Sequence, residues 1–333
     1  MRTAVVGGGS WGTALAIQLA RAENSVRLWD RSAERVADMV THGENRRYLP
    51  GVRLPENIEP RADLSGTLDG AELVLAVVPS QAMREVMQRA ARLIEPEAVV
   101  CCASKGIEQG TLLTMEELMR QTLPPALHRR LCALAGPSFA KEVAEGLPTA
   151  IVVASRDDQA TKVVSDALHA GFFRVYHTDD VIGLELGGAL KNVIAIATGV
   201  ADGIGVGLNA RAAIITRGLA EISRLARRHG AHELTMLGLG GVGDLVLTCT
   251  GDLSRNRRVG LGLGHGKTLA AILEELGQVA EGVTTAKSAW ELAQRSGVDM
   301  PITEQIYRML YEDKPAAEAM RDLLQRDRKF ERS

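Results

Sequence analysis

The sequence predicts an α/β domain with a parallel sheet, followed by an all-α domain. Up to about residue 180, short apolar runs alternate with helical patterns, which is the order of elements in βαβ units. Beyond that point the strand signals stop and only helical patterns continue. A chain of 333 residues is long enough for about two domains. We therefore expect one domain over residues 1–180 and a second over residues 181–333.

The candidate strands of the first part are short runs of valine, leucine, alanine and cysteine. Right-handed crossovers between parallel strands would place helices on both faces of their sheet. The runs predicted as strands are 3–6, 26–29, 73–77, 98–102, 132–135 and 150–153.

The second part is predicted as a series of helices. Pro301 fits the first turn of one of them, where proline is tolerated. No low-complexity linker separates the two parts, so we expect them to pack closely and to form a ligand cleft at their junction. The predicted helices are 181–201, 209–229, 255–262, 268–276, 283–296, 302–312 and 316–326.

Composition and charge give no indication of a nucleic-acid-binding, membrane or metal-binding protein. The formal net charge of −2 gives no indication of a nucleic-acid partner. No run reaches the roughly 18 apolar residues of a membrane helix, and the N-terminus lacks a secretory pattern, so we expect no integral membrane segment. The four cysteines lack CxxC spacing, which indicates reduced thiols in a cytoplasmic protein and no metal site.

A glycine motif opens the chain. Residues 3–14 read TAVVGGGSWGTA, in which Gly7, Gly9 and Gly12 have the spacing G-x-G-x-x-G between a predicted strand and an apolar helix. That context is typical of a Rossmann-type dinucleotide site. Gly7 would permit the tight turn, Gly9 the approach of a pyrophosphate, and Gly12 the packing of helix on strand, while the helix N-terminus binds the anion. The alternative is a glycine-rich surface turn.

The end of the second predicted strand bears on the choice between NAD and NADP. An acidic residue there binds the ribose 2′-hydroxyl of NAD, and a nearby arginine accommodates the 2′-phosphate of NADP. Asp30 and Arg31 stand side by side, so the pattern is mixed. Arg31 could stack on adenine, bind a phosphate, or be a solvated surface charge. We expect use of both cofactors with a bias to NADH.

Further ligand contacts are expected beyond the carboxyl ends of the other strands. Lys105 follows the apolar run VVCCAS and precedes a glycine, so we expect it to project into the cleft; the alternative is a solvated loop lysine. The turn at Gly136 and Ser138 can contact a ligand through its backbone and hydroxyl. Ser138 could instead serve only as a helix cap.

Lys191 lies in an otherwise apolar stretch, ELGGALKNVIAIATG. In a helix, Gly187, Gly188 and Ala195 share its face and would leave open space around the ammonium. Each glycine costs a helix roughly 1 kcal/mol relative to alanine, which favours a functional reason for the pair. The alternative is a lysine that extends its ammonium to solvent. Asn192, one residue on, points elsewhere on the helix.

Residues 188–209, GALKNVIAIATGVADGIGVGLN, resemble the signature of the NAD(P)-dependent glycerol-3-phosphate dehydrogenases along its whole length. The resemblance continues at residues 7–11, 104–106, 136–140 and 240–256, and so covers nearly the full chain. It implies interconversion of sn-glycerol 3-phosphate and dihydroxyacetone phosphate with NAD(P)H, with Lys191 as general acid–base. It also implies a role in supplying glycerol phosphate for phospholipid synthesis. A homodimer is the default expectation for a soluble enzyme of this size.

The segment 240–260, GGVGDLVLTCTGDLSRNRRVG, is the expected substrate end of the site. We predict that its glycines form a flexible loop before Asp244, and that Asp252 or Ser254 caps a helix beginning at Arg255. Free N–H groups, a guanidinium and the Asn256 amide would converge there on a phosphate. The two arginines that follow, Arg257 and Arg258, are expected to be solvated.

Motifs and resemblance together give a set of predicted site residues. Many bacterial members of the family that this sequence resembles have a small neutral residue where Asp30 stands, and this departure affects the choice between NAD and NADP. The predicted cofactor contacts are Gly7, Gly9, Ser10, Trp11, Gly12, Asp30, Arg31, Lys105, Ala140, Arg255, Val279 and Glu281. The predicted substrate contacts are Lys105, Gly136, Ser138, Lys191, Asp244, Ser254, Arg255 and Asn256.

Two other functions stay open at this point. One is a related two-domain dehydrogenase for another small hydroxy acid or ketone, as in the 6-phosphogluconate and ketopantoate groups, which lack the full GALKN…DGxGxGxN string. The other is a catalytically silent NAD-binding sensor. Such a sensor would be expected to lose Lys191 or Arg255, and this chain keeps both.

Overall fold

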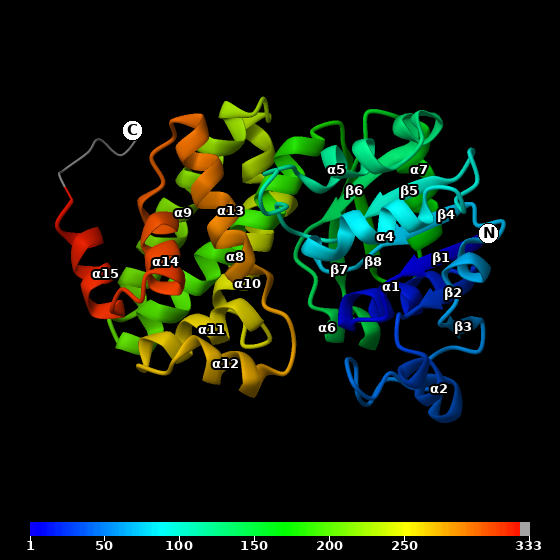
Figure 1. Ribbon diagram of the computed structural model, residues 1–333, viewed down its shortest axis with the longest axis horizontal. Helices are drawn as coiled ribbons and strands as arrows, with labels where there is room; N and C mark the ends of the chain where they lie inside the picture. Colours follow the sequence, from blue (N-terminus) through cyan, green and yellow to red (C-terminus); the bar gives the residue numbers. More distant parts are fainter. Residues whose placement is uncertain (327–333) are drawn as a thin grey trace.

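The computed structural model describes residues 1–326, and residues 327–333 of the second predicted domain lie outside that part. A sheet flanked by helices and a bundle of helices lie side by side (Figure 1). The fold class is therefore the predicted one, an α/β Rossmann-type domain followed by an all-α domain. The strands are β1 (Arg2–Val6), β2 (Ser25–Trp29), β3 (Ile58–Arg61), β4 (Leu73–Ala76), β5 (Val99–Cys102), β6 (Leu131–Ala135), β7 (Thr149–Ala154) and β8 (Phe173–Thr178).

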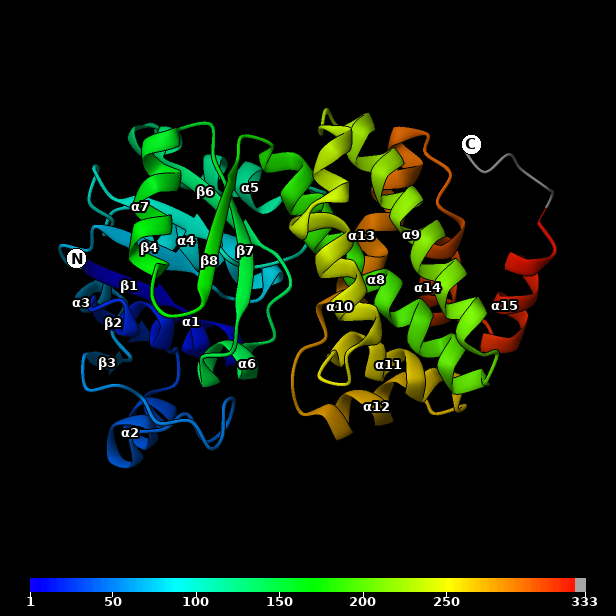
Figure 2. The same ribbon diagram turned by 180° about the vertical axis from the view of Figure 1, so that it is seen from behind.

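The sheet is mixed, with the order β3-β2-β1-β4-β5-β6-β7-β8. Strand β7 runs antiparallel to β6, so the predicted parallel sheet contains one antiparallel pair of strands, near the edge formed by β8; Figure 2 shows this side of the sheet from behind. Helix α6 (Ala140–Glu145), between β6 and β7, has six residues. It spans about 9 Å, less than the roughly 17 Å of a five-residue strand, so it cannot carry the chain back along β6.

The two edge strands, β3 and β8, were not predicted. Pro60 lies in β3, and proline within a run argues against a strand except at a sheet edge. Strand β8 carries exposed Arg174, Tyr176 and His177 and lacks the continuous apolar pattern of the central strands. An edge strand is covered less than a central one, so its apolar signal is weaker.

Helices cover both faces of the sheet, as the crossover rule predicts. On one face the apolar core is completed by helices α1 (Ser10–Arg21), α2 (Ala33–His42), α6 and α7 (Asp158–Leu168). On the other face it is completed by α3 (Leu64–Leu68), α4 (Met83–Ala90) and α5 (Met115–Thr122). Short helical turns, η1 (Ser80–Ala82) and η2 (Pro125–Arg130), follow β4 and precede β6.

The second domain is built around helix α8 (Val181–Ile204), which is buried along most of its length. By length and composition α8 could cross a membrane, contrary to the expectation that no run is long enough, but 94% of its most apolar window is buried inside the protein. Each predicted helix is present with ends shifted by a few residues. They are α8, α9 (Leu208–Arg228), α11 (Arg255–Gly264), α12 (Leu269–Leu276), α13 (Glu281–Ser296), α14 (Pro301–Tyr311) and α15 (Ala316–Leu324).

The predicted flexible loop before Asp244 is wrong. Residues Leu239–Gly243 form a wide helical turn, η4, which follows the turn η3 (Glu233–Leu237) and leads into an unpredicted helix α10 (Asp244–Thr250). A Cβ at Gly240 would lie 2.2 Å from Leu184 Cδ1, and one at Gly241 would lie 2.2 Å from the Met236 carbonyl oxygen. These glycines therefore permit tight packing against α8 and η3.

The two domains meet at the start of α8. Asp180 caps this helix, its Oδ1 accepting from the Gly183 N–H at 2.9 Å, while its Oδ2 accepts from Thr235 Oγ1 at 2.6 Å. Val181 and Leu184 then pack against β6 and β7. We propose the boundary between the domains here, directly before Val181.

Candidate active site

The glycine turn between β1 and α1 has the shape of a dinucleotide cradle. Gly7 has φ +130°, and a Cβ there would lie 2.4 Å from the Val77 carbonyl oxygen. A Cβ at Gly12 would lie 1.8 Å from the Gly7 carbonyl oxygen, so only glycine lets α1 start against the turn. A Cβ at Gly9 would meet no atom of the described residues within 4 Å. The open surface at Gly9 and the N-terminus of the 12-residue helix α1 fit a pyrophosphate.

Asn45 and Tyr48, which were not predicted, hold this turn in place. The buried amide of Asn45 donates to the Gly8 carbonyl oxygen at 2.8 Å and to Thr13 Oγ1 at 2.7 Å. Ser10, a predicted contact, donates from its hydroxyl to the Tyr48 carbonyl oxygen at 2.7 Å. A loop after α2 therefore supports the cradle from outside the motif, and nothing in its local sequence indicates that role. Trp11, the next predicted contact, is partly buried at the start of α1, and its Nε1 has no partner among the described residues.

Asp30 and Arg31 are placed very differently. Asp30 is only 4% exposed, and a Cβ built at Gly8 would lie 2.7 Å from its Oδ2, so its carboxylate borders the glycine turn. Arg31 is exposed. The cation that pairs with Asp30 is Arg35, whose Nη2 lies 2.5 Å from Asp30 Oδ1.

Lys191 is buried beside a carboxylate and does not extend to solvent. Its residue exposure is 6%. Its ammonium donates to Asp244 Oδ1 and, at 2.8 Å, to Thr248 Oγ1. The Thr248 hydroxyl in turn donates to the Asp244 carbonyl oxygen at 2.6 Å. Thr248 was not predicted, because its relation to Asp244 depends on the unpredicted helix α10.

A second lysine shares the same carboxylate. Lys105 Nζ lies 2.7 Å from Asp244 Oδ2 and 3.3 Å from the Gly136 carbonyl oxygen, and the Gly136 N–H donates to Asp244 Oδ2 at 3.3 Å. Lys105 therefore faces the junction of the domains and is not a solvated loop lysine. The Ser138 hydroxyl donates to the Gly136 carbonyl oxygen at 2.9 Å and does not cap α6, which begins with the partly buried Ala140.

Burial and the neighbouring charges set the proton affinity of this group. Burial lowers the pKa of Lys191 to about 7, although the Asp244 carboxylate raises it; the Lys105 ammonium lowers it further. Burial by itself would raise the pKa of Asp244, but the Lys105 and Lys191 ammoniums together hold it below its usual value. The site thus contains an ionised carboxylate and a lysine able to change protonation near neutral pH.

The two glycines before Lys191 do not leave the open space that was expected. A Cβ at Gly187 would lie 2.8 Å from the Gly240 carbonyl oxygen. A Cβ at Gly188 would lie 3.4 Å from Ala135 Cβ and 3.7 Å from Lys105 Cγ. They allow η4 and Lys105 to approach α8, and so bring Asp244 and Lys105 to Lys191.

The segment predicted to bind the substrate phosphate lies at the start of α11. Ser254 is the cap, accepting from the Arg257 N–H at 3.2 Å, so the Asp252 alternative is wrong. Burial lowers the pKa of Arg255, with partial compensation by Glu281. The Asn256 amide bridges Asn192 Oδ1 at 2.9 Å and the Gly282 N–H at 2.9 Å. A desolvated guanidinium at a helix N-terminus is suited to an anionic ligand.

Arg257 is not solvated, in contrast to the prediction. Its side chain is 12% exposed and binds Asp202 Oδ2 through Nη2 at 2.8 Å, which ties the first turn of α11 to the end of α8. Arg258 is exposed, as predicted.

The segment between α12 and α13 connects the helical domain to the cofactor domain. The Gln278 side-chain oxygen lies 3.4 Å from both Ser10 Oγ and Arg255 Nη1. Glu281 Oε2 accepts from Ser80 Oγ at 2.7 Å. Val279 between them is half exposed. The segment thus joins the glycine turn, the end of β4 and the phosphate end.

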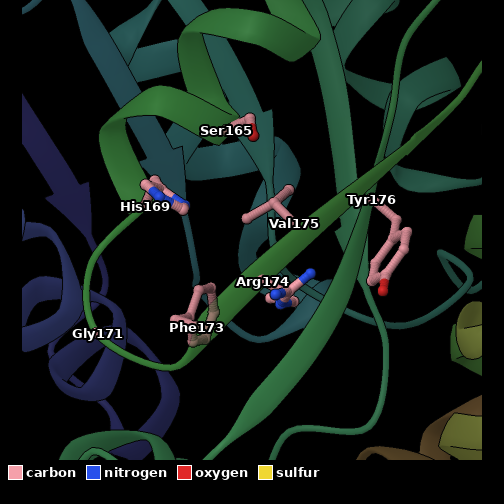
Figure 3. Close-up of a pocket in the computed structure, with 7 residues that line it drawn as sticks. All are labelled: Ser165, His169, Gly171, Phe173, Arg174, Val175 and Tyr176. Atoms are coloured by element: carbon pink, nitrogen blue, oxygen red, sulfur yellow. The ribbon is translucent and has the colours of Figure 1, made fainter.

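Outside this site, a pocket lies at the edge of the sheet beside α7 and β8 (Figure 3). None of the predicted site residues lines it. Its lining residues are Ser165, His169, Gly171, Phe173, Arg174, Val175 and Tyr176. Residues 1–326 contain no group of three histidine, cysteine, aspartate or glutamate side chains that could hold a metal ion.

Comparisons with known proteins match this architecture from end to end. Residues 2–161 match the family described as NAD-dependent glycerol-3-phosphate dehydrogenase N-terminus, and residues 180–321 match its C-terminus. The glycerol-3-phosphate dehydrogenase (NAD(P)+) of Anaeromyxobacter dehalogenans (strain 2CP-C) is 54% identical over 331 residues, which cover 99% of this chain and 100% of that protein. The protein of that name from Myxococcus xanthus (strain DK1622) is 51% identical over 331 residues, 99% of each chain.

Solved structures agree with the sequence comparisons. The crystal structure of glycerol-3-phosphate dehydrogenase from Coxiella burnetii has a TM-score of 0.93 at 43% identity, covering 98% of this chain and 99% of that one. A ketopantoate reductase from Ralstonia eutropha JMP134 has a TM-score of 0.60 at 16% identity, with 96% and 100% coverage, and shares the fold alone. The chain belongs to the NAD-dependent glycerol-3-phosphate dehydrogenase family.

Proposed function

We propose that the protein interconverts sn-glycerol 3-phosphate and dihydroxyacetone phosphate by hydride transfer with NAD(H) or NADP(H), and that Lys191 is the general acid–base. One observation carries the assignment of Lys191. It is a buried lysine with a pKa near 7, held between Asp244 and Thr248 at the junction of the two domains. A proton donor and acceptor works best when its pKa lies near the operating pH.

The nicotinamide cofactor, when bound, takes up or delivers the hydride. The glycine turn from Gly7 to Gly12 and the N-terminus of α1 would hold its pyrophosphate, with Asp30 beside the adenosine ribose. The 277–281 segment would lie along the cofactor, because it already contacts Ser10 and Ser80.

Lys191 would donate a proton to the substrate oxygen in reduction and accept one from it in oxidation. An ammonium has three N–H donors, and Asp244 and Thr248 take two of them, which leaves one for the oxygen at C2 of the substrate. In reduction the ammonium would protonate this oxygen. In oxidation the neutral amine would take the hydroxyl proton. Asp244 keeps the amine in place in both directions.

Arg255 would bind the substrate phosphate. It is partly buried at the N-terminus of α11, and the 3.4 Å contact from Nη1 to Gln278 is its one hydrogen bond to the described residues. Lys105 adds a second cation beside Lys191, on the other oxygen of Asp244. A phosphorylated three-carbon substrate suits a site with cations at both ends.

The test is oxidation of NADH by the purified protein with dihydroxyacetone phosphate, compared with a 2-oxo acid of similar size. We expect turnover with the phosphorylated ketone. Turnover with the 2-oxo acid alone would favour the related dehydrogenases instead. Binding of NADH without turnover of either would favour the silent sensor.

We further propose that the enzyme acts in the cytoplasm and supplies glycerol phosphate for phospholipid synthesis. Its four cysteines are buried and free, which suits a reducing compartment. Expression in a bacterium that needs glycerol for growth, because it lacks this activity, should remove that requirement. The homodimer stays a prediction, which light scattering after size-exclusion chromatography would test.

A further inference from the structure

Arg35, which lies outside every predicted site, is bound to Asp30, the residue proposed to lie beside the adenosine ribose. It stands in the first turn of α2, and its guanidinium holds Asp30 at two points. Nη2 lies 2.5 Å from Asp30 Oδ1, and Nε lies 3.2 Å from Asp30 Oδ2. This fork geometry is the strong form of a carboxylate–arginine pair.

The two oxygens of Asp30 are not equivalent. Oδ1 accepts from Arg35 and also from the Ser32 N–H at 2.8 Å, so it is fixed on the α2 side. Oδ2 accepts only the longer Arg35 bond among the described residues, and it is the oxygen that a Cβ at Gly8 would meet. Asp30 therefore keeps one acceptor on the side of the glycine turn.

Arg35 itself lies beside Tyr48, a residue that also contacts the glycine turn. Its carbon Cζ lies 5.6 Å from the centre of the Tyr48 ring, and the Tyr48 carbonyl oxygen accepts from Ser10 in the glycine turn. The Arg35 side chain is 31% exposed. Two of the five guanidinium N–H groups of Arg35 donate to Asp30. Among the described residues, the other three have no hydrogen-bond acceptor.

We propose that Arg35 is the residue that admits NADP to this site. By pairing with Asp30 it neutralises the carboxylate that would repel a 2′-phosphate, and its remaining N–H groups bind that phosphate. Asp30 Oδ2 stays able to accept from the ribose 2′-hydroxyl of NAD. One site then takes both cofactors. The exposed Arg31, next to Asp30 in the sequence, is secondary. This inference rests on the proposed use of a nicotinamide dinucleotide.

The test uses the full-length protein and ligands that cannot react. Affinities for ADP-ribose and 2′-phospho-ADP-ribose are measured by calorimetry, beside kcat/KM for NADH and NADPH. In Arg35→Ala we expect the affinity for 2′-phospho-ADP-ribose to fall about 10- to 100-fold, the range of hydrogen bonds to charged groups. The affinity for ADP-ribose should change less than about threefold. The ratio of kcat/KM values should shift to NADH by a similar factor.

Two further variants separate the roles. Asp30→Asn should lower the affinity for ADP-ribose. The affinity for 2′-phospho-ADP-ribose should stay the same or rise, because Arg35 no longer pairs with a carboxylate and can bind the phosphate. The double variant Arg35→Ala, Asp30→Asn should recover part of the 2′-phospho-ADP-ribose affinity that Arg35→Ala loses. Arg130→Ala is the matched control: Arg130 pairs with Glu97 before the start of β5, outside the glycine turn and the loop that supports it, and both affinities should stay unchanged.

If Arg35→Ala lowers the affinity for both ligands equally, Arg35 has a purely structural role and the proposal is overturned. An unchanged affinity for 2′-phospho-ADP-ribose, or a loss found in Arg31→Ala alone, would also overturn it. The ligands lack a nicotinamide, so these measurements do not depend on turnover. If Arg35 discriminates between the two ligands but the protein does not turn over dihydroxyacetone phosphate, the proposed function is refuted and this inference stands.

Discussion

Lys191 on α8 and Asp244 on α10 form a buried ion pair, and Asp244 binds Lys105 through its other oxygen, 2.7 Å from Lys105 Nζ. One carboxylate thus faces two ammoniums, which leaves a net positive charge in a buried site when both lysines are protonated. A buried charge without full compensation favours either loss of a proton or an anionic ligand. The proposed chemistry uses both, since Lys191 exchanges a proton and the substrate carries a phosphate.

Replacing Lys191 with alanine should lower kcat by about 100-fold or more, the usual scale of general acid–base catalysis. The measurement is steady-state reduction of dihydroxyacetone phosphate at pH 7. Lys162→Ala, an exposed change on α7, is the control for loss of a lysine. A kcat near that of the wild type would remove Lys191 from the acid–base role.

The pH dependence should differ in sign between the two directions. Oxidation needs the neutral amine, so its kcat should rise through about pH 7, where Lys191 loses its proton. Reduction needs the ammonium, so its kcat should fall through the same range. Profiles measured in both directions from pH 5.5 to 9 would check this. Two profiles with the same sign would argue against a single acid–base group.

Removing the charge of Lys105 should move these profiles to higher pH. Lys105 lowers the pKa of Lys191, and without it Asp244 would act on Lys191 alone. In Lys105→Met we expect kcat for oxidation to rise at a higher pH than in the wild type, whatever its maximum value. In Lys105→Arg it should rise at the same pH as in the wild type. An unshifted profile in Lys105→Met would show that burial and Asp244 alone set the pKa.

Arg255→Ala should mainly raise the KM for dihydroxyacetone phosphate, about 10- to 100-fold for the loss of a charged hydrogen bond to phosphate. Arg258→Ala, three residues on and exposed, should leave KM unchanged. If Arg255→Ala keeps the wild-type KM, the phosphate binds elsewhere.

Glu185 offers a test of stability against pH. Burial raises the pKa of this carboxyl to about 8, and its Oε1 accepts from the Glu116 N–H at 2.9 Å. The folded protein therefore holds a proton that the unfolded chain releases near its usual pKa of 4.5, so stability is lost as pH rises from about 5 to 8. Glu185→Gln should remove this loss, raising Tm at pH 8 and changing it little at pH 5. The exposed change Glu274→Gln serves as control, and equal shifts at both pH values would contradict the argument.

The order of elements could be predicted because each signal is local. Central strands such as β4 and β5 are continuous apolar runs, and α8 is largely apolar because it is buried along most of its length. The glycine motif and Lys191 were recognisable for the same reason. The edge strands β3 and β8 and the reversal at β7 could not be predicted, because partial cover weakens the pattern and direction depends on the length of a short connection.

By itself the sequence determined the fold class, the family resemblance and most of the chemical groups that we propose for the site. Only the tertiary structure decided how those groups are paired. Asp244 reaches Lys191 because glycines on both α8 and η4 allow these elements to touch, and Arg35, not Arg31, lies on Asp30. Such pairings join residues that are far apart in the chain or on opposite sides of a turn. They depend on packing distances, which no local pattern of residues specifies.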